Sequence, residues 1–454
     1  MSVAEPARVD RAERRHRQES SIVSREMEQT RVIVIGGGLA GLTAAATLST
    51  NGKAVTVVEG AEEIGGRARS RHRDGFDLNT GPHALYRAAG GLEVLRGLGV
   101  AVRGKRPRID RAGIWVGGAA VPFARYLRRD VGDRLKVVKA MAGLGPSAAA
   151  EWSGRPAAEW IESVTDDEQG RLVLASLIRT TTYSADTSIL DAGAAVAQLR
   201  AAMHGVLYLH HGWSSLVDGL ADIVRANGGI VMTGTPAEGV EHDDEVHGVR
   251  LADGRTLPAA AVIVAVNDAR RAAGLLEGDG ATNLGHVGAH TVPVRMAHLD
   301  VAMRPLPSRR FPALLGLDDA IFVTVPSSVA DVAPDGADVI QVARYLRPGE
   351  ESGNHRAGLE AVLDAHQPDW RDHVVDLRYV PRSMVAGDHA RHATGGTSGR
   401  PSVDAAGVRG LAVAGDWVGP AGMLADASIL SGLAAAASVA ADMLSAVRRS
   451  QARR

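Results

Sequence analysis

Residues 32–41 read Val-Ile-Val-Ile-Gly-Gly-Gly-Leu-Ala-Gly. An apolar, β-branched run breaks into Gly36, Gly38 and Gly41 at GxGxxG spacing, and an Ala- and Leu-rich helix is predicted to follow. Gly36 permits the tight strand-to-helix turn, Gly38 lets the backbone approach a pyrophosphate, and Gly41 lets the helix lie close to the strand. The stretch therefore predicts a dinucleotide-binding turn, with the N-terminus of the helix facing the phosphates.

A second predicted strand, residues 54–58, ends in Glu59. This acid stands roughly 20 residues beyond the glycines, where a carboxylate binds the ribose hydroxyls of a dinucleotide. Strand, turn, helix, strand and acid follow one another in the order that this fold requires. The order indicates a nucleotide-binding domain rather than an isolated Gly-rich loop.

The composition is that of a large α/β enzyme. At 454 residues the chain exceeds what a single core usually covers, so two domains are expected. A net charge of −1 and an aromatic content of 4% argue against a nucleic-acid partner. The chain has no cysteine, which excludes disulfides and thiolate metal sites. No metal site is expected at His210-His211 either, because adjacent side chains diverge and no third ligand is near in the sequence.

The ends of the chain carry separate expectations. Residues 1–26 are polar, charged and without apolar periodicity, which predicts a disordered extension. The longest uncharged apolar stretch, 427–441, falls short of the ~20 residues that a membrane span needs, so we expect a buried helix. No secretory signal is recognised, and a cytoplasmic protein is expected. Residues 123–144 predict a basic amphipathic helix; a solvated face is the simpler interpretation, and peripheral contact with anionic lipid is the alternative.

The segment 59–67, Glu-Gly-Ala-Glu-Glu-Ile-Gly-Gly-Arg, is the next landmark, and Gly81-Pro82-His83 follows it. Glu59 followed by Gly-Gly-Arg resembles the extended FAD fingerprint of the flavin amine oxidase, phytoene desaturase and protoporphyrinogen oxidase superfamily. The resemblance implies that Arg67 supplies a cation for the pyrophosphate or a ribose, and that Gly66 lets the chain pass beside the cofactor.

Later stretches extend the resemblance over most of the chain. The segment 212–231 resembles the helix and strand with which this superfamily returns to its FAD domain, and Val240 matches a backbone position that relatives turn toward adenine. Residues 410–417 are similar to the second FAD motif, in which Asp416 beside Gly415 meets the ribityl and pyrophosphate region. The next helix in relatives points its N-terminus at the flavin pyrimidine edge, where free N–H groups stabilise the reduced flavin.

Together these motifs imply a non-covalent FAD, since a cysteinyl link is excluded. The residues expected to hold it are Gly36, Gly38, Leu39, Ala40, Gly41, Glu59, Gly66, Arg67, Gly81, Val240, Gly415, Asp416, Gly422, Met423 and Leu424.

The motifs imply an interleaved α/β architecture. A Rossmann-like FAD-binding domain of the glutathione-reductase type is expected from 27–84, 206–285 and 396–448. The intervening segments, 85–205 and 286–395, are expected to form an α+β substrate domain facing the flavin ring. No second GxGxxG occurs, so no NAD(P)H domain is expected, and electrons would leave to oxygen, a quinone or another acceptor.

Departures from the amine-oxidase pattern favour an apolar substrate. Leu433 follows the Ser-Gly at 431–432, where amine oxidases commonly place an aromatic residue of the cage around the amine. No lysine falls in a motif near the flavin N5. We therefore expect an FAD-dependent oxidoreductase, resembling the phytoene desaturase branch, that dehydrogenates or desaturates a largely apolar small molecule by hydride transfer to N5. An amine or amino-acid oxidase is the first alternative, and a non-redox flavin-binding isomerase or structural flavoprotein is the second.

His83 and Tyr86 are the expected substrate-facing residues. Relatives direct the position of His83 toward the flavin and substrate, where a histidine could orient a polar group or accept a proton. A structural hydrogen bond is the alternative interpretation of His83. Tyr86 is expected on the same wall, and Trp417 is expected either beside the flavin or in the core.

Overall fold

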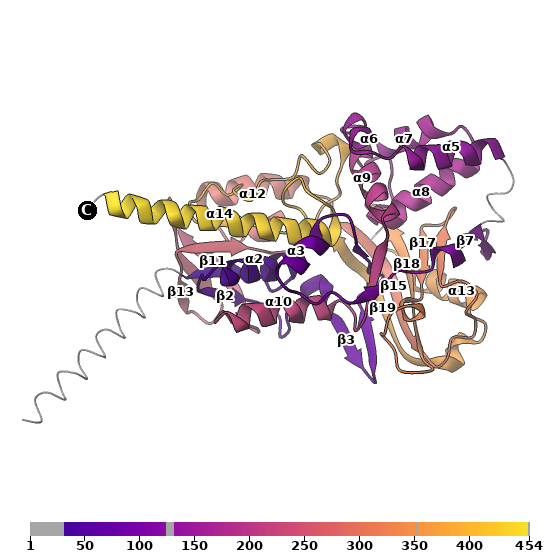
Figure 1. Cartoon of the computed structure of the whole chain (residues 1–454), viewed down its shortest axis with the longest axis horizontal. Helices are drawn as coiled ribbons and strands as arrows, with labels where there is room; N and C mark the ends of the chain where they lie inside the picture. Colours follow the sequence, from indigo (N-terminus) through magenta and orange to yellow (C-terminus); the bar gives the residue numbers. More distant parts are fainter. Residues whose placement is uncertain (1–30, 124–130, 351, 453–454) are drawn as a thin grey trace, which may run out of the picture.

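The structure is a computed structural model that describes residues 31–123, 131–350 and 352–452 (Figure 1). The predicted extension at 1–26 lies outside the described residues, and so do residues 124–130 of the predicted basic helix. The rest of that helix forms α5 (Val131–Ala142), on which Val137 is buried and Val138 is 54% exposed. Contact of this helix with lipid stays a prediction.

The first layer is a five-stranded parallel sheet in the order β10-β2-β1-β14-β20. Its strands are β1 (Val32–Ile35), β2 (Val55–Val58), β10 (Ile230–Met232), β14 (Ala261–Val264) and β20 (Leu411–Val413). Every residue of β1 is buried, because both faces of the sheet are covered. Val32 and Val34 pack into the core on one face, and Ile33 and Ile35 into the core on the other.

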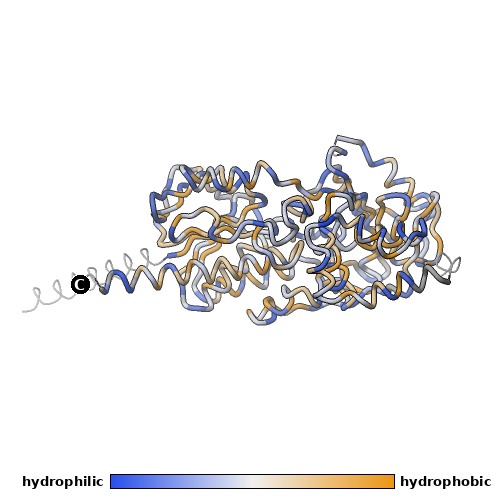
Figure 2. Tube along the Cα trace, turned by 90° about the horizontal axis from the view of Figure 1, so that it is seen from above, coloured by the Kyte–Doolittle hydropathy of each residue, from blue (hydrophilic) through white to orange (hydrophobic). Residues whose placement is uncertain are grey.

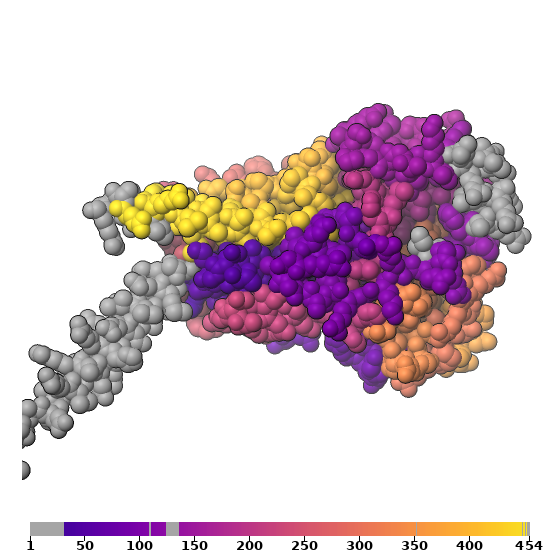
Figure 3. Space-filling view, in the orientation of Figure 1, coloured from indigo at the N-terminus to yellow at the C-terminus, as the bar shows by residue number. Residues whose placement is uncertain are grey.

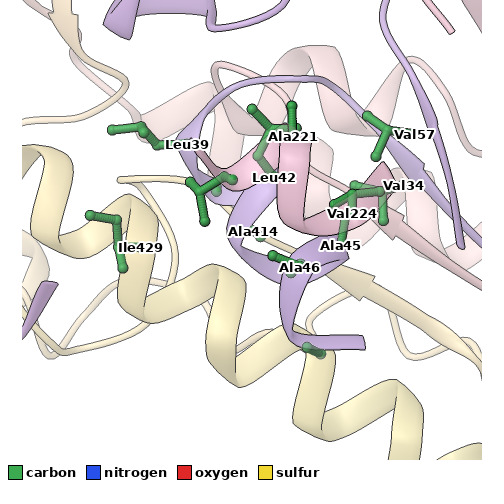
Figure 4. Packing of buried hydrophobic residues seen from close by; sticks show 14 of the residues in the cluster. Val34, Leu39, Leu42, Ala45, Ala46, Val57, Ala221, Val224, Ala414 and Ile429 are labelled. Carbon is green, nitrogen blue, oxygen red and sulfur yellow. The ribbon is translucent and has the colours of Figure 1, made fainter. Parts of the chain in front are cut away.

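Three helices cover one face of this sheet: α2 (Leu39–Thr50), α10 (Ser214–Ala226) and α14 (Leu424–Ala452). Figure 4 shows Leu42 of α2 between Ala221 of α10 and Ile429 of α14. Gly432 allows α14 to lie against α2, because a Cβ at this position would collide with the carbonyl of Ala40. The start of α14 is thereby fixed next to the glycine-rich turn.

The other face is covered by the meander β11 (Ala237–His242), β12 (Val246–Leu251) and β13 (Thr256–Pro258), together with α11 (Ala269–Ala273) and α12 (Gly278–His290). Figure 2 shows apolar segments gathered along the middle of the body and hydrophilic segments at its edges.

α14 is longer than the apolar stretch at 427–441. Its segment Leu424–Ala446 is long and apolar enough to cross a membrane by length and composition, which corrects the expectation that it is too short. The segment stays apolar on average although it contains two acidic residues, Asp426 and Asp442. Ala435 and Val439 are buried in the same core as α2, and the helix lies along the body of the protein (Figure 3). It is therefore a core helix along this part, as expected.

The second layer is a seven-stranded sheet in the order β19-β15-β18-β17-β16-β7-β8. Its strands are β7 (Gly113–Val116), β8 (Ala119–Pro122), β15 (Val294–Met303), β16 (Ala313–Gly316), β17 (Ile321–Thr324), β18 (Asp338–Leu346) and β19 (Val374–Ala386). Its pairings are antiparallel except that of β16 with β7. α13 (Arg356–His366) packs into the core of this sheet.

A helical layer adjoins this sheet, as Figure 1 shows at the upper right. It consists of α5, α6 (Pro146–Glu151), α7 (Ala157–Val164), α8 (Glu168–Thr182) and α9 (Ala192–Met203). Short elements connect the layers: β3 (Ser70–Arg73), β4 (Phe76–Asn79), β5 (Leu85–Tyr86), α3 (Gly91–Gly97), β6 (Gly104–Lys105) and β9 (Val206–Leu209).

The predicted fold class is confirmed: a Rossmann-like α/β domain is combined with a second domain of mixed helices and strands. The five-stranded sheet takes its strands from 27–84, 206–285 and 396–448. The seven-stranded sheet takes its strands from 85–205 and 286–395. We propose the interleaved domain boundaries on this basis.

Candidate functional site

A cavity of about 400 Å³ lies at the carboxyl ends of the parallel strands. This is the edge of a doubly wound sheet at which ligands bind. Predicted cofactor residues make up one part of its wall: Gly36, Gly38, Leu39, Ala40, Glu59, Gly66, Arg67, Gly415, Asp416 and Leu424. The predicted substrate residue His83 lines it as well. Segments far apart in the sequence therefore meet here as the motifs predict.

The glycine-rich turn fits a diphosphate. Gly36 has a φ of +110°, which side chains rarely adopt, and a Cβ there would collide with the carbonyl of Ala265. A Cβ on Gly38, by contrast, would have no atom within 4 Å, so the turn is open beside the cavity. No side chain caps the N-terminus of α2, which begins at Leu39. The free N–H groups and positive dipole end of this helix suit an anionic ligand.

Glu59 is held rigidly where β2 ends. Its Oε2 accepts the N–H of Gly37 at 2.7 Å, and its Oε1 accepts the N–H of Ala61 at 2.8 Å. A carboxylate has about four lone-pair sites, so both oxygens keep the capacity to accept hydroxyl protons. The arrangement fits the ribose-binding role that the sequence predicts.

Arg67 and Asp416 form a bidentate ion pair on the cavity wall. The two nitrogen-oxygen distances are 2.6 and 2.9 Å, and the Asp416 side chain is 1% exposed. Arg67 also donates to the carbonyl of Val385 at 2.8 Å. Burial alone would lower the pKa of Arg67, but the charge and hydrogen bonds of Asp416 raise it above its ordinary value. Arg67 therefore neutralises a buried carboxylate beside the place where FAD carries its own negative charge.

Ser431 secures the turn that presents Asp416. Its Oγ accepts the N–H of Gly415 at 3.0 Å and lies 2.9 Å from the Gly415 carbonyl oxygen. The Ser-Gly pair at 431–432 thus has a packing function: Ser431 holds the second FAD motif, while Gly432 lets α14 approach α2.

Both ring nitrogens of His83 contact backbone carbonyl oxygens. Nδ1 lies 2.9 Å from the oxygen of Gly81, and Nε2 lies 3.1 Å from that of Arg67. A neutral imidazole carries one N–H and can donate to only one of them. Burial lowers the pKa of His83, and the two carbonyls oppose this shift. The ring also meets Trp213 edge-on, with centroids 5.1 Å apart. This geometry favours the structural interpretation of His83.

Three predicted glycines lie behind the cavity wall rather than on it. Gly41 faces the carbonyl of Gly36, where a Cβ would collide, so it serves the close helix–strand contact that the motif requires. Gly81 and Gly422 have φ values of +80° and +70° and form the turns that present their neighbours.

Other expected residues also lie away from the cavity. The hydroxyl of Tyr86 donates to the carbonyl of Thr181 at 2.8 Å, so Tyr86 does not face a substrate. Val240 is buried in the meander, and Ala237, three residues earlier, lines the cavity instead. Met423 packs in the core of the helical layer. Trp417 is a core residue whose Nε1 donates to the carbonyl of Val266 at 3.0 Å.

Leu433, which stands where amine oxidases commonly place a cage aromatic, does not line the cavity. Leu433 is 36% exposed, because α14 turns that position away from the cavity. Leu424 lines the cavity instead, at the beginning of the helix.

Several lining residues escaped the motifs. Asn267 and Arg271 follow β14, and the rule that parallel strands end at the site could have found them. Tyr183 directly follows α8, and Met296 and Met384 lie on β15 and β19; no local pattern marks any of the three.

The model of one protein family, flavin containing amine oxidoreductase, matches residues 39–273, just over half of the chain. A 4,4'-diapolycopene oxygenase of Methylomonas sp is 43% identical over 58 residues, which are 13% of this chain and 12% of that protein. An L-amino-acid oxidase of Crotalus adamanteus is 44% identical over 55 residues, 12% of this chain and 11% of that protein. The chain thus matches only about an eighth of the length of these curated relatives.

The fold of an oxidoreductase from Methanosarcina mazei matches 89% of this chain and 99% of that one, with a TM-score of 0.72 and 21% identity. This likeness shows a shared fold. The family match spans just over half of the chain and shows that the chain belongs to the flavin containing amine oxidoreductases.

Proposed function

We propose that this enzyme dehydrogenates or desaturates a largely apolar small molecule. One observation supports the proposal most strongly. The part of the cavity wall that the proposed substrate domain and its adjoining loops supply carries no charged side chain among the described residues. It consists of Thr80, Pro82, His83, Ala84, Tyr183, Met296, Met384 and Val385, of which Thr80, His83 and Tyr183 are the members with polar side-chain atoms.

The polar groups of this wall have partners already. The hydroxyl of Tyr183 donates to the carbonyl of Pro82 at 2.9 Å, and its ring meets Tyr345 edge-on with centroids 5.6 Å apart. Among the described lining residues there is no lysine, and the acids Glu59 and Asp416 both belong to the predicted FAD contacts. Nothing on this wall compensates a substrate ammonium group for lost hydration, whereas an apolar molecule is stabilised by burial.

The residues around the wall position a substrate and exclude water from it. Leu424, Ala425 and Ser428 bring the first turn of α14 to the cavity, so the positive end of the helix dipole lies at this wall. FAD, when bound, would supply the two-electron oxidant: one substrate hydrogen would leave as a hydride to N5, the second would leave as a proton, and the electrons would pass to oxygen, a quinone or another acceptor. The helix terminus would stabilise the negative charge that accompanies this transfer.

The short matches to relatives do not decide the substrate. They include an oxygenase whose name denotes a polyene and an oxidase of amino acids, each matched over less than 60 residues. The apolar wall favours the first of these two substrate classes. We also propose a cytoplasmic location, with α14 kept in the core.

Anaerobic bleaching of the oxidised flavin tests the proposal. Purified full-length protein, which is expected to be yellow and to release unmodified FAD on denaturation, is mixed separately with polyenes, porphyrinogens, primary amines and amino acids. We expect an apolar donor to bleach the visible flavin band. Bleaching by amines or amino acids alone would assign the protein to the oxidases, and a band that no donor changes would favour a non-redox flavoprotein.

A further inference from the structure

A chain of polar contacts runs from the large sheet to the cavity. It begins at Asp300 on β15, whose side chain is 1% exposed. Its Oδ1 accepts the amide of Gln341 at 2.7 Å and the N–H of Gly81 at 3.1 Å. The carbonyl of Gly81 contacts one ring nitrogen of His83, and the carbonyl of Arg67 contacts the other. One path therefore joins the interior of the sheet to the turn that carries Arg67.

The buried carboxylate of Asp300 has few partners that could compensate for its lost hydration. A buried carboxylate is costly unless hydrogen bonds and charge partners compensate for lost hydration. Within the described residues no lysine or arginine forms an ion pair with Asp300. Its Oδ2 lies 3.2 Å from Nδ1 of His298, in a geometry outside that of a hydrogen bond. The donors that compensate Asp300 are the amide of Gln341 and the N–H of Gly81, which lies within 3.1 and 3.3 Å of its two oxygens, so the buried acid anchors the Gly81 turn.

Gly81 connects Asp300 to His83 through the two sides of its peptide backbone. Its φ of +80° belongs to a backbone conformation that side chains rarely adopt, and the ring of His298 stands 3.2 Å from where a Cβ would be. The N–H of Gly81 is therefore directed at Asp300 while its carbonyl faces His83. A shift of this turn would move both ends of the path together.

Arg67 ends the path at the cofactor site. Its carbonyl oxygen lies 3.1 Å from Nε2 of His83, and its guanidinium clamps Asp416. The bidentate bond to Asp416 has a specific geometry, so the position of the main chain at Arg67 affects it.

We propose that Asp300 is a positioning residue for the FAD site, which acts through Gly81 and His83 to hold the Arg67–Asp416 pair in place. His83 then packs between the two turns and donates its single N–H to one of the two carbonyls, rather than accepting a proton from the substrate. This inference rests on FAD binding, the cofactor half of the proposed function, and is independent of the substrate.

Two substitutions of similar shape separate a hydrogen-bonding role from bulk packing. Asp300→Leu removes the acceptor of the Gly81 N–H, whereas Asp300→Asn keeps one acceptor oxygen for it. Full-length holoenzyme is diluted, the released flavin is measured by fluorescence, and the FAD Kd is obtained from the fit. The Tm of each variant is measured separately by thermal unfolding. We expect Asp300→Leu to weaken FAD binding about fivefold to a hundredfold and Asp300→Asn to stay within about twofold of the wild type.

Asp338 supplies the matched control. It is as deeply buried in the same sheet, on β18, and accepts the N–H of Leu306 at 3.2 Å and the guanidinium of Arg309 at 2.6 Å. It does not line the cavity. Asp338→Leu is expected to lower the Tm without raising the FAD Kd beyond about twofold.

A second pair of variants covers the case in which Asp300→Leu does not fold. His83→Leu should then weaken FAD binding as Asp300→Leu would, and His83→Gln, which can still bond one carbonyl, should weaken it less. Unchanged FAD binding in folded Asp300→Leu, or equal weakening by Asp338→Leu, would overturn the inference. A wild type that binds no FAD would contradict the cofactor assignment itself.

Discussion

The guanidinium of Arg67 clamps the carboxylate of Asp416 although the two residues stand 349 positions apart in the chain. Each residue belongs to a separate motif, and each was expected to contact FAD by itself. In the structure the two side chains form an ion pair with each other. A carboxylate that is 1% exposed needs a nearby cation, and Arg67 provides it.

The pair predicts a non-additive response to mutation. Arg67→Met leaves Asp416 buried without a charge partner and is expected to destabilise the protein by about 3–5 kcal/mol, with loss of FAD. Asp416→Asn added to Arg67→Met should restore part of that stability, because the unpaired charge is gone. Thermal unfolding and flavin content of the two single variants and the double variant measure the coupling.

Arg69 offers the control for this cycle. It contacts Glu63 at 3.3 Å with both side chains largely exposed, and exposed pairs contribute little. Arg69→Met should leave Tm and flavin content nearly unchanged. Equal effects of the Arg67 and Arg69 substitutions would show that the buried pair has no special part in the site.

Glu59 is expected to act on FAD affinity, both directly and through the Gly37 N–H that it accepts. Glu59→Ala removes a charged acceptor beside the predicted ribose position, and we expect FAD binding to weaken by about 1.5–3 kcal/mol, roughly tenfold to a hundredfold. Fluorescence titration of FAD release measures this change. Glu62→Ala, three residues on at an exposed position, is the comparison and should bind FAD like the wild type. Similar affinities for both variants would remove Glu59 from the cofactor site.

Gly432 is expected to tolerate no side chain. A Cβ there would collide with the carbonyl of Ala40, so Gly432→Ala should push α14 away from α2, lower the Tm and reduce flavin content. Gly358 lies in α13 with no atom within 4 Å of a Cβ. Gly358→Ala should therefore be neutral or stabilising by up to about 1 kcal/mol, since alanine favours a helix. A harmless Gly432→Ala would show that the two helices are not packed as closely as described.

Asp426 predicts a specific dependence of stability on pH. Its Oδ1 accepts the N–H of Gly91 at 2.8 Å, and burial raises the pKa of the carboxyl to about 7. The folded protein thus holds this proton more tightly than the unfolded chain, where the pKa is about 3.9. The resulting stability is fully present below about pH 4 and is lost as the pH rises through 7.

Asp426→Asn isolates this contribution. An asparagine keeps an acceptor for Gly91 and cannot ionise, so the variant should lose less stability than the wild type between pH 5 and pH 8. Chemical denaturation at both pH values provides the comparison. Parallel pH dependences in the two proteins would mean that Asp426 ionises as easily when folded as when unfolded.

Local motifs predicted which segments of the nucleotide-binding half lie together at the cavity. The strand, turn and helix of 32–41 and the acid Glu59 depend on backbone geometry that neighbouring residues decide. Arg67 and Asp416 were also recognised, but their mutual contact was not. Pairing between distant segments depends on tertiary packing, which leaves no local trace.

The substrate wall was predicted poorly, for related reasons. Leu424 of α14 was expected to contact FAD and does line the cavity, but the sequence did not mark Tyr183 or Met296 as its neighbours there, because the direction of a side chain depends on how its element packs. Tyr86 was expected beside His83, but its hydroxyl bonds the carbonyl of Thr181. Met384 belongs to a long strand whose sequence has no motif at all.

The apolar wall itself permits the most direct measurement. Met384 lines the cavity, whereas Met203 is 53% exposed at the end of α9. With the apolar donor that bleaches the flavin of the wild type, the donor concentration giving half of the maximal bleaching rate is compared in wild type, Met384→Gln and Met203→Gln. We predict that Met384→Gln raises this concentration about tenfold at unchanged flavin content, because an amide on the wall lowers the affinity for an apolar molecule by about 1–2 kcal/mol, while Met203→Gln behaves as the wild type. Equal half-saturation in all three proteins would contradict the assignment of this wall to an apolar substrate.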